Sequence, residues 1–373
     1  MCTNKTPFAF REIHIMQKNQ WLLYLLFAAG TACSGKHPVN RDTESTSDSV
    51  VVSTSSETTD STSETEPVLY VDNLTGNEIS PDIDWIQIPA GSFIFGSAEG
   101  EPCSFPSEKQ VPVTLTHPFV IAATEITQAQ WEALDFTHSS WAIGPDKPVT
   151  LINFFEAAAW CNRLSRFEGL DPCYDLDNCT NQVGSGCFDE GGVATRSCGP
   201  YEAAFICTGE LHRFADRYSC PGYRIPSSAE WEYASRAGIS DAHTYGGDVS
   251  EEPISSCSEQ PSLNEIAWYC NNSGEEVHDV AQKLPNPWGL YDMLGNVEEW
   301  TDYYFGGGLT LDYEHPDQAV TDPIGPAFDE TMETRGRYFD STGCLLRFSS
   351  RFYNYTDDRR DVTGFRPVRT IFE

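Results

Sequence analysis

The chain has 373 residues and a formal net charge of −33, with 56 acidic and 23 basic side chains. This length has room for one large domain or two ordinary ones, each able to bury a core. The acidic balance argues against nucleic acid as a partner, because a phosphate backbone is bound through clustered Lys and Arg. It fits solubility outside the cell, or partners that are basic or bridged by a metal ion.

Residues 1–33 have the layout of a signal peptide. Trp21 to Ala32 is an apolar run too short to span a bilayer, and Lys18 precedes it. Met16 is the natural start of such a peptide, which makes the residues before it an upstream addition. We therefore expect the chain to be exported into an oxidising space, where disulfides persist.

Cys33 follows small residues and precedes Ser34 and Gly35, an order that resembles the cleavage box of a bacterial lipoprotein. Lipidation of Cys33 would anchor the protein to a membrane of the cell envelope, at the outer membrane or in the periplasm. Gly30 stands where such a box usually has leucine, so ordinary cleavage after Ala32, and secretion, stay open.

Residues 34–80 are expected to form a disordered linker. Ser, Thr and acidic residues dominate its first half, and this composition lacks the apolar side chains needed for a core. The folded domain is expected over residues 81–373. It opens with two β-rich runs in WIQIPAGSFIFGS, separated by the turn residues Pro89, Ala90 and Gly91, a pattern that predicts a hairpin.

Three helices are predicted, each from a capping residue followed three positions later by Glu or Gln. The pairs are Thr127 and Gln130, Asn153 and Glu156, and Ser227 and Glu230. Gly238 predicts the end of the third helix. In the second helix the apolar residues fall on one face, which predicts burial of that face.

Residues 170–221 are expected to be a loop-rich insertion with six cysteines: Cys173, Cys179, Cys187, Cys198, Cys207 and Cys220. No CxxC pair or Cys/His spacing of the zinc type is present, so disulfides are favoured over a metal site. Their connectivity stays open, and Cys257 and Cys270 could close another loop. With Cys2 and Cys33 set aside, eleven of the 13 cysteines remain, and the unpaired one is expected to be Cys161 on the second helix.

Asn286 to Trp300, NPWGLYDMLGNVEEW, combines aromatic side chains with glycines and a run of acidic or amide residues. Asp292 and Glu299, with backbone carbonyls between them, could place several oxygens around one hard cation such as calcium. From spacing alone, a core loop whose acids are only solvated is favoured over a cation site.

GLYDMLGNVEEW closely resembles the signature GLYDMxGNVWEW of the formylglycine-generating enzyme, or sulfatase-modifying factor, family. Five further blocks follow the family's order: IPAGSFIFGS, EITQAQW, PVTLINFFEAAAWCNRLS, YRIPSSAEWEYASRAG and RFSSRFYNYTDDRRDVTGFRPVR. The resemblance covers about Asp82 to Arg369. It implies an irregular α+β fold related to C-type lectins, with little regular secondary structure, into which the disulfide-rich insertion is placed.

The resemblance also implies a calcium site in the central stretch. Carried over, its ligands are the side chains of Asp292 and Glu299 and the backbone carbonyls of Gly295 and Val297. Glu298 stands where the family usually has tryptophan. None of the four implied ligands is changed by this difference.

The enzymes of this family oxidise a substrate cysteine with oxygen, using copper(I) held by two cysteine thiolates, the soft ligands that this ion prefers. The corresponding segment here is Arg335 to Arg351, RGRYFDSTGCLLRFSSR. Tyr338 and Gly343 stand at the two copper positions. Cys344, one residue away, is a weak catalytic candidate by itself, so copper is not expected.

Six arginines concentrate positive charge near the C-terminus: Arg347, Arg351, Arg359, Arg360, Arg366 and Arg369. Internal ion pairs with the acids of the central stretch are favoured over a binding site for an anion.

The sequence thus favours an exported, calcium-stabilised module that binds a protein, peptide or glycan in the cell envelope and has lost the copper cysteines. One alternative is a formylglycine-generating oxidoreductase acting on a peptidyl cysteine of sulfatases, with Cys344 and another thiol at an altered site. Another is a structural envelope lipoprotein without a catalytic role.

Overall fold

The computed structural model describes residues 69–184, 197–198, 204–253, 256–304, 319–325 and 330–372, which all belong to the unit Glu64–Glu373. The predicted signal peptide, Cys33 and the first half of the predicted linker lie outside these ranges. Within them, no helix is long and apolar enough to cross a membrane.

Short strands and long connections make up most of the described chain, as expected for an irregular α+β fold. The helices are α1 (Gln128–Ala133), α2 (Phe154–Phe167) and α3 (Ser228–Arg236), with the 3₁₀ turns η1 (Arg217–Ser219) and η2 (Gly343–Leu345). The strands are β1 (Trp85–Ile88), β2 (Gly91–Phe95), β3 (Val111–Leu115), β4 (Phe119–Ala122), β5 (Cys179–Thr180), β6 (Ser197–Cys198), β7 (Ile206–Cys207), β8 (Glu298–Tyr304), β9 (Val320–Thr321), β10 (Thr331–Arg335), β11 (Arg351–Tyr355), β12 (Arg359–Arg360), β13 (Thr363–Gly364) and β14 (Val368–Thr370).

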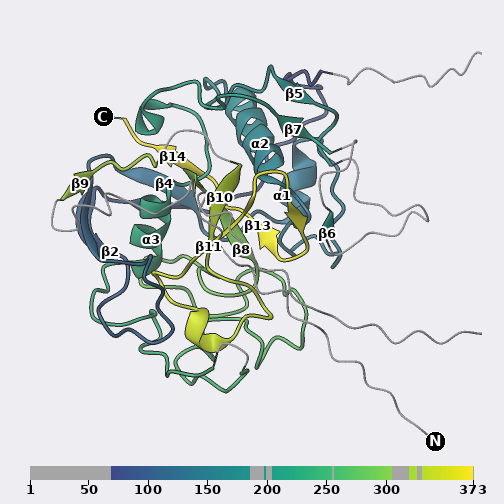
Figure 1. Ribbon diagram of the computed structural model, residues 1–373. Helices are drawn as coiled ribbons and strands as arrows, with labels where there is room; N and C mark the ends of the chain where they lie inside the picture. The colour runs from purple at the N-terminus through teal and green to yellow at the C-terminus, as the bar shows by residue number, and fades with distance from the viewer. Residues whose placement is uncertain are drawn as a thin grey trace, which may run out of the picture. The chain divides into compact units, whose positions relative to one another are not determined.

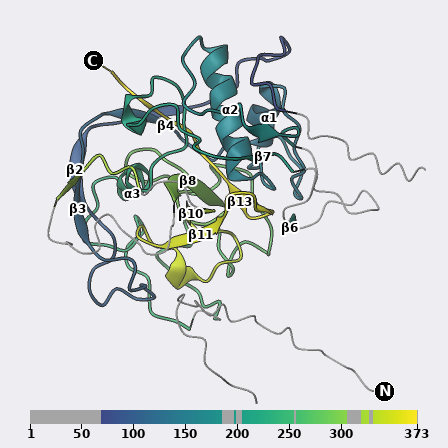
Figure 2. The same cartoon turned by 45° about the horizontal axis from the view of Figure 1, so that its top comes forward.

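The central sheet has the strand order β11-β10-β8-β13 and joins the end of the central stretch to the C-terminal segment. Figures 1 and 2 show α1 and α2 together beside this sheet and α3 apart from them. Trp300 of β8 is fully buried and meets Phe154 of α2 edge to face, with ring centroids 6.1 Å apart. The central stretch therefore passes directly into the aromatic core.

The predicted hairpin near the start of the domain is wrong. β1 pairs antiparallel with β4, whereas β2 pairs antiparallel with β3, so the turn between β1 and β2 carries the chain from one sheet to another. Ile88 and Phe95 are both buried in the same hydrophobic cluster, because the two sheets share one core. Two β-rich runs and a turn do not specify which strand each run will pair with.

The three predicted helix starts are confirmed. In each, the cap side chain accepts the N–H of the third helical residue, and the Glu or Gln side chain of that residue accepts the cap N–H. The third helix ends through two residues with positive φ, Ala237 at 47° and Gly238 at 85°. Glycine takes this left-handed conformation without steric cost, which is why the predicted end was close.

The second helix is buried on all sides, rather than on one face as predicted. Its residues from Phe154 to Ser165 are all buried, including the charged Glu156 and Arg163. The insertion covers part of this helix, since Asn162 exchanges hydrogen bonds of 2.9 and 3.1 Å with the backbone of Tyr174. Helical periodicity reports one apolar face and cannot anticipate an insertion packed against the other.

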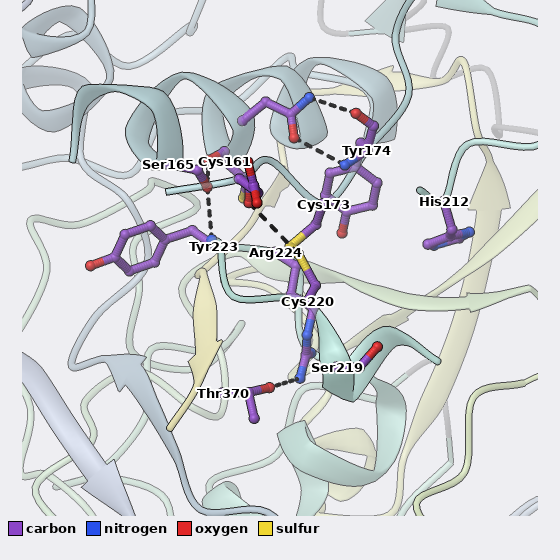
Figure 3. Close-up of a disulfide and its surroundings, with 12 residues drawn as sticks. Cys161, Ser165, Cys173, Tyr174, His212, Ser219, Cys220, Tyr223, Arg224 and Thr370 are labelled. Atoms are coloured by element: carbon purple, nitrogen blue, oxygen red, sulfur yellow. Dashed lines mark hydrogen bonds between the residues drawn. A yellow bond between two sulfur atoms is a disulfide. The ribbon is translucent and has the colours of Figure 1, made fainter. Parts of the chain in front are cut away.

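Disulfides hold the insertion, as predicted. Cys173 bonds to Cys220 and Cys179 to Cys207, while Cys187 lies outside the described residues. Figure 3 shows the Cys173–Cys220 disulfide with Tyr174, His212 and Arg224 around it. The predicted pair of Cys257 and Cys270 is also confirmed. Among the described cysteines, Cys161 is free and buried, as predicted.

Candidate functional site

The loop before β8 is shaped by Asn286. Its side-chain oxygen accepts the N–H groups of Trp288 and Leu290, each at 3.0 Å, and its amide donates to the carbonyls of Ala234 and Ser235 beyond the middle of α3. These four bonds fix the loop against α3. The predicted calcium ligands, between Asp292 and Glu299, come next along the sequence.

Glu299 lies at the centre of this region, and both of its carboxylate oxygens accept hydrogen bonds from protein groups. The guanidinium of Arg366 binds it through two bonds of 2.7 Å, and Trp231 Nε1 donates to Oε2 at 2.8 Å. Arg366 and Trp231 are fully buried. A paired arginine gives Glu299 a complete partner without any metal ion.

Asp292 and Glu125 are less well satisfied. Asp292 Oδ2 accepts the Ala281 N–H at 2.7 Å, whereas buried Oδ1 has no hydrogen-bond partner. Glu125 Oε1 accepts a bond of 3.3 Å from Asn296, whereas buried Oε2 has none. A buried carboxylate oxygen without a partner carries the full cost of desolvation, so both oxygens call for a further donor or a cation.

The pKa values of Asp292 and Glu125 also indicate that these carboxylates lack stabilising partners. The pKa of Asp292 is raised to about 6, first by burial and also by the Glu299 charge, against the lowering effects of the Ala281 N–H and Arg366. Burial also raises the pKa of Glu125 well above its usual range, and the Asp292 charge adds to the shift. The charges of Glu125, Asp292 and Glu299 all act on the guanidinium of Arg366, and Lys283 adds a second positive charge near Asp292. Three carboxylates therefore share two positive groups.

The predicted calcium ligands fit the ion in part. Asp292 fits, because its free oxygen is a hard donor. Glu299 is bonded to Arg366 and Trp231 and has no free oxygen of this kind. In the part of the chain that the structure describes, no three His, Cys, Asp or Glu side chains form a ready metal site, so backbone carbonyls, such as the predicted ones of Gly295 and Val297, would have to complete the shell.

The sequence interpretation missed Glu125. The signal was present, since a glutamate stands inside the apolar run FVIAATEI, and a charge in such a run is buried only with partners. The structure brings Glu125 to Asp292 through β4 and the turn that follows it. Without the tertiary pairing of β4, nothing in the sequence joins the two residues.

The positions that correspond to the copper ligands contain no thiol. Tyr338 packs against Phe339, and the Arg360 guanidinium lies 5.8 Å from the centre of its ring. Gly343 begins η2, where an added Cβ would come within 2.4 Å of the Gln260 side chain. Cys344, the weak catalytic candidate, forms a disulfide with Cys103, so in this structure it offers no thiolate.

The loop between β2 and β3 covers this segment. Arg347 is fully buried beneath it and donates to Glu101 Oε1 at 2.7 Å, to Glu108 Oε2 at 2.9 Å and to the Cys103 carbonyl at 2.9 Å. Together with the Cys103–Cys344 disulfide, these bonds tie the loop down. Ion pairs and a disulfide therefore hold the segment in which the sequence resemblance placed the two copper positions.

Five of the six C-terminal arginines, all except Arg369, form ion pairs within the described chain, but most of their partners lie outside the central stretch, where they were predicted. Arg366 and Arg360 do bind acids of that stretch, Glu299 and Glu298. The other pairs join Arg347 to Glu101 and Glu108, Arg351 to Glu333, and Arg359 to Glu156 of α2. The sequence interpretation overlooked acids contributed by helices and by the loop between β2 and β3.

A second buried charge cluster was also missed. His212 of the insertion bonds to Asp302 of β8 at 2.9 Å and to Glu210 at 2.9 Å, and Arg217 lies 3.0 Å from Asp302. Its role is structural, because it fastens the insertion to the central sheet. Figure 3 shows His212 near Tyr174, whose ring centroid lies 5.6 Å away.

The fold and the site define an irregular, disulfide-bonded α+β domain with an acidic loop at its centre. Residues 73–371 match the family model of the sulfatase-modifying factor enzyme 1-like domain, so the chain belongs to this family. It is 26% identical to a formylglycine-generating enzyme of Streptomyces coelicolor over 302 residues, which cover 75% of this chain and 87% of that one.

Two further proteins are similar to this chain. The chain is 29% identical over 194 residues to "Chaperone protein LppX" of Paenibacillus barcinonensis, a match that covers half of this chain and 62% of the relative, less than two thirds of its length. The solved structure of Treponema denticola variable protein 1 is similar with a TM-score of 0.56 and 25% identity, covering 77% of this chain and 95% of that one.

Proposed function

We propose that this protein is an exported binding module of the sulfatase-modifying factor type and that it does not carry out the oxidation of cysteine. The observation that carries this proposal is the Cys103–Cys344 disulfide beside Tyr338 and Gly343. Copper(I) at the enzyme positions requires two thiolates, and neither position has one here. The four described disulfides are typical of an exported protein.

The ligand is proposed to be a protein, peptide or glycan of the cell envelope. The relative named a chaperone supports a protein or peptide, since chaperones act on other chains. Lipidation at Cys33 would place the module at a membrane surface. Fold membership alone does not define a ligand, so this part of the proposal rests on the site and on the relatives together.

Calcium is proposed as a structural ion of the central loop. Asp292 would supply a carboxylate oxygen, and the carbonyls of Gly295 and Val297 would add neutral oxygens. Glu125 lies near enough to Asp292 for the two carboxylate charges to interact. When bound, the ion would supply positive charge in addition to that of Arg366 and Lys283, which face three carboxylates. Glu299 would take part only by giving up a bond to Arg366 or Trp231.

The test of the proposed function is an activity assay on the exported chain. The protein is mixed with copper(I), oxygen and a peptide carrying the sulfatase-type C-x-P-x-R motif, and mass spectrometry then looks for the aldehyde. We expect no formylglycine, beside an active formylglycine-generating enzyme as the control. Catalytic turnover would overturn the proposal, and the variant Cys344→Ser would then show whether this cysteine takes part.

A further inference from the structure

A cavity of about 550 Å³ lies where the insertion meets the start of α2 and the end of β11. Phe155 of α2, Ile206 and Cys207 of the insertion, and Tyr355 of β11 contribute to its lining. One wall therefore comes from the insertion, which the family blocks in the sequence do not include. The cavity therefore depends in part on the insertion.

The walls of this cavity are fixed. The Cys179–Cys207 disulfide holds the insertion strand, and the Asn153 amide donates to the Phe205 carbonyl at 2.7 Å. On the other side, the Thr356 carbonyl accepts the Phe154 N–H at 3.1 Å, and the Thr356 N–H donates to the Glu330 carbonyl at 2.9 Å. A cavity with fixed walls binds a ligand without a large cost of ordering.

Apart from Thr356, the remaining described lining is acidic. Glu330, Asp357 and Asp358 border the cavity, and none of the described lining residues is Lys or Arg. Burial and the neighbouring Asp357 raise the pKa of Asp358, although the Tyr355 N–H and Arg360 act in the opposite direction. Arg360 is directed elsewhere, since it donates to Glu298 at 2.6 Å and to Asn354 at 2.9 Å.

The strand beside the cavity presents aromatic side chains to solvent. Phe352, Tyr353 and Tyr355 of β11 are 38%, 36% and 56% exposed. Among the described strands, β11 is an edge strand of the central sheet and pairs only with β10. A terminal strand can accept an extended peptide through main-chain hydrogen bonds, and exposed tyrosines are common in binding surfaces.

We propose that β11 and this cavity together bind an extended peptide segment that carries a lysine or arginine side chain. The peptide main chain lies along β11, and its cationic group enters the cavity between the carboxylates of Asp357 and Asp358 and the ring of Tyr355. An aromatic face and carboxylates both attract an ammonium or guanidinium group. The inference rests on the proposed binding function and names the ligand class for it.

The experiment selects random phage-displayed peptides on the exported chain and measures synthetic copies of the selected peptides by fluorescence anisotropy. We expect the selected peptides to contain Lys or Arg. Replacing that residue by glutamine in the peptide, or using the Asp357→Asn/Asp358→Asn protein, should weaken binding at least about tenfold. The loss should be larger at low salt, because the screened Coulomb attraction contributes most there.

A matched control is the Asp82→Asn/Asp84→Asn variant, since these two aspartates line a different cavity of about 460 Å³. It should bind the peptides as tightly as the unmodified chain. Thermal melting of each variant establishes that it is folded. Tyr355→Ala, an exposed position, provides a second variant that removes the ring without changing charge.

Three outcomes would overturn the inference: no selected peptide, selected peptides that lack a basic residue, or equal binding by the Asp357→Asn/Asp358→Asn protein. None of these outcomes would contradict the proposed binding function, because the ligand could still be a glycan or could bind at another surface. Formation of formylglycine in the activity assay would overturn the proposed function, and peptide binding at β11 would still be measured separately.

Discussion

Arg366 and Glu299 form a fully buried ion pair through two hydrogen bonds of 2.7 Å, one of them from Nε. The arginine also donates to the carbonyls of Ala122 and Ala123 at the end of β4 and to that of Tyr291 in the loop. One guanidinium thus joins β8, β4 and the central loop. It is also the counter-charge for the buried acids beside it.

Arg366→Met should destabilise the fold strongly. The substitution keeps much of the side-chain volume but leaves the buried carboxylate of Glu299 without its partner, and Asp292 and Glu125 lose a neighbouring positive charge. Removing one partner of a buried pair costs about 3–5 kcal/mol. Urea unfolding in calcium-free buffer measures the loss.

The control for this prediction is Arg360→Met, which removes the partner of Glu298 at a side chain that is 26% exposed. Solvent screens that pair in part, and Glu298 keeps bonds from Asn354 and Thr363. A loss for Arg360→Met as large as that for Arg366→Met would contradict the special position of Arg366.

Calcium should raise the melting temperature of the unmodified chain, and Asp292→Asn should remove most of that rise. Stabilisation by a ligand that binds only the folded state follows the ratio of ligand concentration to Kd, reaching about 2.7 kcal/mol at a hundredfold excess. The asparagine keeps the shape of Asp292 and avoids unpairing Arg366, which a change at Glu299 would do. Differential scanning calorimetry with calcium and with a chelator gives the two melting temperatures.

An equal rise in Asp292→Asn would remove the calcium assignment from this loop. Asp357→Asn/Asp358→Asn serves as the control, because these two acidic side chains line the cavity beside β11 and not the central loop. Its calcium response should equal that of the unmodified chain.

Local signals in the sequence predicted the parts of the fold that local chemistry determines. Thr127, Asn153 and Ser227 cap their helices because a short oxygen-bearing side chain bonds to a nearby backbone N–H, whatever the tertiary context. The free Cys161 followed from an odd count and its place on a buried helix. The family itself was visible from the blocks around GLYDMLGNVEEW.

Features that depend on distant partners were beyond such signals. β1 pairs with β4 rather than with β2, and the choice depends on β14, which adds to the other edge of β4 from the C-terminal end of the chain. Glu125 and Asp292 come together only after this pairing. The cavity beside β11 likewise needs the insertion. The fold of the insertion depends on disulfides whose connectivity cannot be deduced from the sequence.

Asp302→Asn should remove a stabilisation of the fold that is present near neutral pH and is lost at acidic pH. Despite burial, which acts to raise it, the pKa of Asp302 is lowered from 3.8 to about 2 by Arg217 and His212. A carboxylate with a lowered folded-state pKa contributes stability above its unfolded pKa near 3.8, and this stability is lost as pH falls toward 2. The gap in unfolding free energy between the unmodified chain and Asp302→Asn should therefore narrow by about 2 kcal/mol over this window.

Urea unfolding of both chains at several pH values between about 5 and about 1 measures the gap, because this range brackets the two pKa values, 3.8 and about 2. Asp357→Asn, at a partly exposed position beside the β11 cavity, is the matched Asp→Asn control. A constant gap for Asp302→Asn would mean that the contacts of Asp302 do not depend on its charge.

Removal of the Cys103–Cys344 disulfide should cost more stability than removal of Cys257–Cys270. The two bonds close loops of very different length, with sequence separations of 241 and 13 residues. In the chain-entropy account, a bond that closes a longer loop restricts the unfolded chain more, which gives upper values of about 5 and about 3 kcal/mol. The paired substitutions Cys103→Ser/Cys344→Ser and Cys257→Ser/Cys270→Ser are compared by urea unfolding under oxidising conditions.

The Cys103→Ser/Cys344→Ser variant should also loosen the loop over Arg347, seen as faster hydrogen exchange of the Ser97 and Glu108 amides. The Cys257→Ser/Cys270→Ser variant should leave that exchange unchanged. Equal losses, or unchanged exchange at Ser97 in the first variant, would show that the ion pairs of Arg347 hold this loop without the disulfide.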